Sequence, residues 1–185
     1  MVPEPIAIVM SSATTVPDAA SVPIRPPRLL GLYLLLIIIS AIEAFDGLSR
    51  APVLFGDMSQ IPDPGVGGAI IKTYIASHPM LALAALGFAT IGRLRYAIIT
   101  LGALLLMTWL HFMPSVVRHG FDFRGVSAFE TPVRIIAFPL MAACAITLAA
   151  RGERLGLATM LVSIPTLYGA ASVIAFGIGI FLYGF

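Results

Sequence analysis

Two carboxylates lie one helical turn apart in the segment IEAFDGLSR, which closes the long apolar run LLGLYLLLIIIS. Glu43 and Asp46 have the i, i+3 spacing that places two side chains on one face of a helix. Carboxylates in such a position can relay protons or coordinate a substrate. Because an ionisable group inside a membrane usually faces a bundle interior or a water-filled cavity, this face is expected to form one wall of a pocket.

Four apolar segments carry an ionisable group at a similar depth. Counted from the arginines that flank or connect the segments, these groups lie 15 to 17 residues away, and they are Glu43, His78, His111 and Arg134. At about 1.5 Å per residue of helix, all four are about 23–26 Å from those arginines. Tyr168 falls near the same level, and Asp46 and Lys72 lie one to two turns farther along.

The shared depth predicts a polar pocket that binds a ligand or relays protons. Its expected members are Glu43, Asp46, Lys72, His78, Trp109, His111, Arg134 and Tyr168. Lys72 or Arg134, from a neighbouring helix, is the expected counter-ion of the two carboxylates. A structural role is the alternative: such groups can hold helices together or extend toward the lipid headgroups, and for Asp46 and Lys72 that role is favoured.

The elements that position these residues are membrane helices. Hydrophobic residues make up 59% of the chain and charged residues 11%, with a mean hydropathy of +1.00, values typical of an integral membrane protein. Nucleic acid is excluded as a partner, because the net charge is only +2 and the basic residues form no stripe. Each apolar run is close to the roughly 20 residues that cross a bilayer as a helix. An all-α bundle of five transmembrane helices is therefore predicted, over residues 29–48, 66–91, 96–113, 132–150 and 155–183.

Residues 1–28 are rich in Pro and Ser, and we expect a flexible cytoplasmic tail before the transmembrane domain of residues 29–185. Orientation follows from the basic residues, which gather before the first span and in two short connections: Arg25, Arg28, Arg93, Arg95, Arg151 and Arg154. By the positive-inside rule this side is cytoplasmic, so the N-terminus is predicted inside and the C-terminus outside. The pocket then faces outward.

Two histidines at matching depth on adjacent helices allow a b-type haem, with His78 and His111 as the axial ligands. The alternative metal site, built from Glu43, Asp46, His78 and His111, has suitable ligand types but no local signature. Cys144 is the only cysteine, which excludes an internal disulfide and a CxxC redox centre.

The stretch FATIGRLRYAIITLGALLLM resembles the second-to-third helix hairpin of DoxX-like bacterial membrane proteins, and LHFMPSVVRHGFDFRGVSAFE is similar to the segment that follows it in that family. The resemblance covers about residues 30–150. The segment Phe45-Asp46-Gly47-Leu48 departs from the family pattern, and the fifth helix is extra. The resemblance implies an inner-membrane protein that partners redox enzymes, with quinone as a ligand, and it transfers interest to His111, Arg95 and Glu130.

Two functions from different classes follow. The favoured one is a membrane subunit or anchor of a larger, quinone-linked redox assembly in the bacterial inner membrane, with a protein partner or a second copy packed on small residues of the fifth helix. The other is a small transporter or proton conductor that uses Glu43, Asp46 and His78. The chain is not expected to be an enzyme on its own; Glu43 as base with His78 or His111 as acid would be the enzymatic alternative.

Overall fold

The computed structural model describes residues 27–50, 52–55, 65–121 and 127–184. Within them the elements, in chain order, are α1 (Pro27–Ser49), α2 (Pro52–Phe55), α3 (Val66–Thr90), α4 (Leu94–His119), α5 (Ser127–Pro132), the π-helical turn η2 (Val133–Ala137), α6 (Phe138–Arg151) and α7 (Leu155–Tyr183). The described residues contain no strand, and five helical stretches are long and apolar enough to cross a membrane. The predicted fold class is thereby confirmed. The tail predicted over residues 1–28 lies almost entirely outside the described residues.

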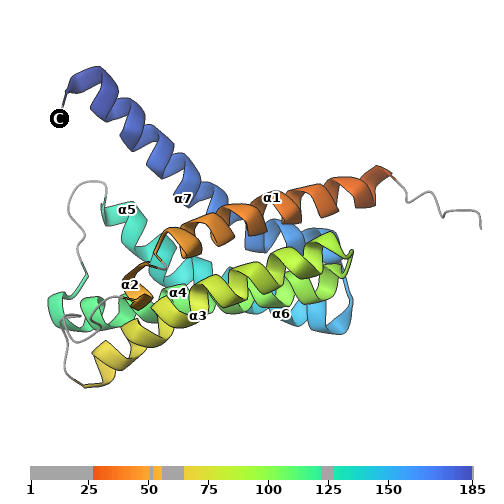
Figure 1. Cartoon of the computed structure of the whole chain (residues 1–185), viewed down its shortest axis with the longest axis horizontal. Coiled ribbons are helices and arrows are strands. Elements are labelled where there is room, and N and C mark those ends of the chain that lie inside the picture. The colour runs from red at the N-terminus through yellow and green to blue at the C-terminus, as the bar shows by residue number, and fades with distance from the viewer. Residues whose placement is uncertain (1–26, 51, 56–64, 122–126, 185) are drawn as a thin grey trace, which may run out of the picture.

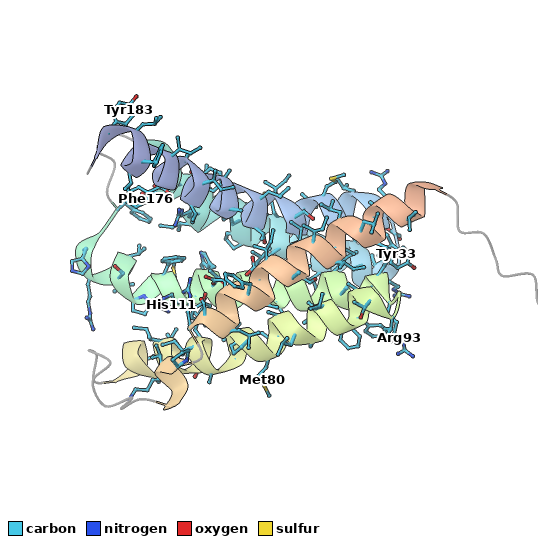
Figure 2. The ribbon with its side chains drawn as sticks, turned by 45° about the horizontal axis from the view of Figure 1, so that its top comes forward. Tyr33, Met80, Arg93, His111, Phe176 and Tyr183 are labelled. Atoms are coloured by element: carbon cyan, nitrogen blue, oxygen red, sulfur yellow. The ribbon has the colours of Figure 1, made fainter. Side chains whose placement is uncertain are left out.

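The five long helices form a closed ring. Each packs against its neighbour along the chain, and α7 returns to pack against α1 (Figure 1). The fourth member of the ring is continuous through α5, η2 and α6, from Glu130 to Arg151. One end of the bundle carries the two tight turns with Arg93, Arg95, Arg151 and Arg154, and we call it the arginine end. His111 lies away from Arg93 and Tyr33, toward the opposite end (Figure 2).

Apolar residues fill the half of the bundle next to the arginine end. Leu36 and Ile39 of α1 are fully buried there against Ile98 and Leu101 of α4 and against alanines of α3, α6 and α7. Small side chains allow helix backbones to approach closely, and dispersion contacts at that distance hold membrane helices together. This half of the bundle is therefore a tightly packed core.

Side chains tie the turns of the arginine end to the helices. The Tyr33 hydroxyl donates to the Gly92 carbonyl at 3.0 Å, and Arg95 Nε donates to the Ala149 carbonyl at 2.9 Å. Arg95 also donates to the Ala150 carbonyl. The last carbonyls of a helix have no partner inside the helix, so Arg95 caps the end of α6.

α4 is longer than the sequence suggested. It continues through Pro114 to His119, whereas the predicted span ends at residue 113. A proline removes only one hydrogen bond and can be accommodated in a membrane helix. The helix ends at Gly120, whose positive φ of 72° favours glycine.

The second half of α7 separates from the bundle. The buried residues of α7 end at Thr166, and the C-terminal part of the helix angles away from the other helices (Figure 1). Its side chains are largely exposed from Val173 onward, and a Cβ added at Gly169, Gly177 or Gly179 would meet no atom within 4 Å. The small-residue face predicted for this helix therefore does not pack against the residues that the structure describes.

Candidate functional site

A cavity of about 660 Å³ lies in the half of the bundle remote from the arginine end. Helices α1, α3, α4, α6 and α7 and the turn η2 all contribute to its walls, which are mostly apolar. Seven of the eight residues predicted for the pocket line it: Glu43, Asp46, His78, Trp109, His111, Arg134 and Tyr168. Lys72, which the counting placed one to two turns farther along α3, does not line the cavity. The volume is within the range of about 300–1,000 Å³ that holds small-molecule ligands.

Glu43 is the polar centre of the cavity. Its Oε1 accepts a hydrogen bond from Thr166 Oγ1 at 2.6 Å, and its Oε2 lies 3.4 Å from His78 Nε2. The Glu43 side chain is 13% exposed and the His78 side chain 3%. A buried carboxylate needs such partners, because removing it from water is costly unless hydrogen bonds or an opposite charge compensate. The three residues join α1, α3 and α7.

Gly47 permits the close contact between α1 and α3 at this site. A Cβ at Gly47 would lie 2.6 Å from His78 Nδ1 and 3.0 Å from the Pro79 Cα. Both distances are too short for any side chain without a shift of α3. The glycine one turn after Glu43 therefore sets the distance at which His78 meets the carboxylate.

Asp46 lies at the open side of the cavity and is paired differently from the prediction. Its Oδ1 accepts a hydrogen bond from Arg50 Nη2 at 3.0 Å, one turn along the chain, and its Oδ2 is 4.0 Å from His78 Nε2. Burial alone would lower the pKa of Arg50, but the hydrogen bond with Asp46 and the neighbouring charges raise it above its ordinary value. Arg50 therefore stays cationic.

The prediction that Lys72 or Arg134 is the counter-ion of Glu43 and Asp46 is therefore wrong. Arg134 instead forms an ion pair with Glu130, four residues earlier in the chain. The physical reason is local: a partner one helical turn away is already held at contact distance, whereas a partner on another helix must also point in the right direction.

Tyr74 joins the two histidines. Its ring stacks on His111 with centroids 4.3 Å apart and meets His78 edge-on at 5.1 Å. Nδ1 of each histidine is buried without a hydrogen-bond partner among the described residues. The two rings are therefore held in place by packing, and their polar atoms are only partly satisfied by the protein.

Trp109 is fixed by an irregularity in the fourth span. Pro139 lacks the N–H group that would bond to the Ile135 carbonyl in an α-helix, and the preceding residues form the π-helical turn η2. Trp109 Nε1 donates to this free carbonyl at 2.9 Å. The bond holds the indole at the cavity wall, next to the segment that carries Arg134.

Arg134 also borders a second, smaller cavity of about 330 Å³, which lies between the end of α4 and the α5–η2 segment. Its polar walls include His119 and Glu130. On the other side of the main cavity, Tyr168 meets Phe138 edge-on with centroids 5.8 Å apart. Arg134 and Tyr168 therefore form part of the wall of the main cavity. Among the described residues, neither forms a hydrogen bond or an ion pair with Glu43.

The geometry does not fit the haem alternative. An axial ligand must direct a ring nitrogen into a gap wide enough for a porphyrin. Nε2 of His78 faces the carboxylates of Glu43 and Asp46, and Nδ1 is enclosed against Gly47. Across the described ranges, no group of three or more His, Cys, Asp or Glu residues is placed to hold a metal ion, so the four-residue metal site is not supported either.

Fold and site together define a class: a helical bundle compatible with an integral, multi-pass membrane protein, with a mostly apolar cavity that contains a carboxylate–imidazole pair. Comparison with protein-family models, curated proteins and solved structures finds no match. Of the residues singled out by the DoxX-like resemblance, His111 lines the main cavity, Glu130 the smaller one, and Arg95 caps α6 at the other end.

Among the residues that contact the polar groups of the site, Gly47, Arg50, Tyr74 and Thr166 were not predicted. Two of them carry a signal in the sequence, since Arg50 is four residues after Asp46 and Tyr74 four before His78, the spacing of neighbours on a helix face. Thr166 carries none, because its place beside Glu43 depends on how α7 packs against α1.

Proposed function

We propose that this protein is a membrane subunit of a bacterial redox assembly and that its cavity binds the ring of a quinone-like ligand. In this proposal the arginine end faces the cytoplasm and the cavity lies in the outer half of the inner membrane, in agreement with the positive-inside rule. The observation that carries the proposal is the position of Glu43, held between Thr166 and His78 at the end of an apolar cavity.

The chemistry of the site suits a ring that exchanges protons. A quinone presents carbonyl oxygens that accept hydrogen bonds, and a hydroquinone presents hydroxyl groups that donate them. A carboxylate accepts protons and a protonated imidazole donates them, so Glu43 and His78 can serve both forms. Aromatic walls from Tyr74, Trp109 and His111 suit a flat ring.

A partner enzyme must supply the electrons. Reduction of a quinone adds electrons and protons in equal number, and a carboxylate–imidazole pair exchanges protons only. A dehydrogenase is therefore the proposed partner and source of electrons, and the Glu43–His78 pair is the proposed source of protons at the ring.

A conducting path is less well supported. Between the cavity and the arginine end, the described residues form the packed cluster of Leu36, Ile39, Ile98, Leu101 and small side chains, and the buried polar side chains beside it, Ser40, Thr159 and Ser163, carry hydroxyl groups and no charge. A transporter or proton channel needs polar groups or water along such a segment, since ions do not cross packed hydrocarbon. No specific feature of the described bundle favours transport over binding.

Purification in mild detergent tests the proposal. We expect a quinone to be found by mass spectrometry of the extracted small molecules, together with a co-purifying dehydrogenase subunit. An absorption spectrum before and after reduction should show the change of a quinone and no haem band. A Soret band would support haem, and a preparation without ligand or partner would contradict the proposal.

A further inference from the structure

The cavity reaches the apolar side surface of the bundle between α1 and α7. Phe45 on α1 and Val173 and Ile174 on α7 all line it, yet their exposed fractions are 77%, 71% and 62%. Residues that line a cavity and are also this exposed mark the place where it opens. We call the opening between Phe45 and the α7 residues Ala170, Val173 and Ile174 the side opening.

The side opening lies at a depth occupied by lipid tails. Ala170 and Ile174 are 16 and 20 residues beyond Arg154 of the arginine end. At about 1.5 Å per residue this is about 24–30 Å, within a hydrocarbon layer about 30 Å thick. The opening lies where α7 angles away from the bundle (Figure 1), and Figure 2 shows Phe176 and Tyr183 on the divergent part.

The polar end of the cavity limits which head group can enter. Two carboxylates, Glu43 and Asp46, face it, and the cations at its edge are already engaged, Arg50 by Asp46 and Arg134 by Glu130. An anionic head group such as a phosphate would be repelled by the carboxylates. A neutral head group that donates and accepts hydrogen bonds matches Glu43 and His78.

We propose that the cavity takes a ligand with a neutral polar ring and an apolar tail, which enters sideways from the bilayer and leaves its tail in the side opening between α1 and α7. This inference rests on the proposed function and adds to it the tail and the route of entry. A ligand that entered from water would not need to pass the exposed residues of α7 that face the lipid.

Trp109 provides a built-in probe, because it is the only tryptophan of the chain and lines the cavity. The full-length protein in nanodiscs is titrated with dimethoxy-methyl-benzoquinone and with the same ring carrying a decyl tail, and quenching of Trp109 fluorescence is followed. The dissociation constants are calculated from the ligand concentration within the bilayer. That concentration is obtained from the partitioning of each compound into protein-free discs. We expect the tailed compound to bind at least about tenfold more tightly on this scale, because its methylene groups contact the cavity wall.

Two neighbouring alanines give a matched pair of variants. Ala170 lines the cavity, whereas Ala171 is exposed and does not line it. Ala170→Phe should weaken the tailed compound by about tenfold and the tail-less compound by less than about threefold, because added volume blocks the tail and leaves the ring site open. Ala171→Phe should change neither.

The two proposals fail in different ways. If both compounds bind equally well on the bilayer scale and Ala170→Phe does not discriminate between them, the side opening is wrong and the ring site stands. If neither compound quenches Trp109 saturably, the quinone-binding function is wrong.

A second measurement uses no added quinone and does not depend on whether the Ala170→Phe variant folds. Small molecules extracted from the purified wild-type protein are identified by mass spectrometry. A retained molecule with a neutral ring and an apolar tail supports the inference, and a retained tail-less solute or anionic lipid overturns it.

Discussion

Glu43 of α1 and Thr166 of α7 are 123 positions apart in the chain and share a hydrogen bond of 2.6 Å. Thr166 is the last residue of α7 that is buried. The bond therefore joins the two helices at the end of the buried part of α7, beside the cavity that both helices line. A contact so placed can fix both the carboxylate and the width of the side opening.

Replacing Thr166 by valine tests the strength of this contact. The change keeps the shape of the side chain and removes the donor, leaving Glu43 Oε1 without its partner. We expect the free energy of unfolding in mixed micelles to fall by about 1–3 kcal/mol. Ser172→Ala is the control, because the Ser172 hydroxyl donates only to the Tyr168 carbonyl of its own helix. If both variants lower the free energy of unfolding equally, the hydrogen bond with Glu43 does not contribute to stability.

Gly47→Ala tests whether close approach of α1 and α3 positions His78. The added Cβ would lie 2.6 Å from His78 Nδ1, and overpacking of this kind costs about 1–3 kcal/mol. Gly31→Ala is the control on the same helix, where no atom lies within 4 Å, and it should be neutral or stabilise the protein by up to about 1 kcal/mol. Thermal denaturation followed by circular dichroism distinguishes the two. A neutral Gly47→Ala variant would mean that the helices are farther apart than described.

The bond from Trp109 to the Ile135 carbonyl can be tested by rescue. Trp109→Phe leaves that carbonyl without its donor, and we expect a loss of about 1–3 kcal/mol. Pro139→Ala supplies a backbone N–H that can bond to Ile135 instead. In the Pro139→Ala background, Trp109→Phe should therefore cost less than half as much. Additive effects in a double-mutant cycle would contradict this explanation of the π-helical turn.

The sequence allowed the helices and their depths to be predicted, but not the directions of side chains. Depth follows from a fixed rise per residue and from arginines near the interface, so Glu43, His78 and His111 could be placed at one level. Lys72 was placed one to two turns farther along by the same counting, and it does not line the cavity. Which face of a helix points inward depends on packing against its neighbours, and a single sequence with apolar residues on all sides gives little signal for it.

Partners on the same helix could be predicted from the sequence, whereas partners on other helices could not. Asp46 with Arg50 and Glu130 with Arg134 are pairs four residues apart, so helical spacing alone could have suggested them. The partners of Glu43 come from α3 and α7, and those of Trp109 depend on a carbonyl left free by a proline on another helix. Such contacts are set by tertiary packing and are not visible in local spacing.

The most direct test of the central claim compares two carboxylates one helical turn apart. Glu43→Gln and Asp46→Asn make the same chemical change, but the Glu43 side chain is only 13% exposed and lies between Thr166 and His78, whereas the Asp46 side chain is 42% exposed and paired with Arg50. The measurement is the dissociation constant of the decyl-tailed quinone from fluorescence quenching of Trp109, with both variants folded. We predict that Glu43→Gln weakens binding by at least about tenfold, because a charged hydrogen-bond acceptor is lost, and that Asp46→Asn changes it by less than about threefold. Equal affinities of wild type and Glu43→Gln would contradict the assignment of Glu43 as the polar centre of the ligand site.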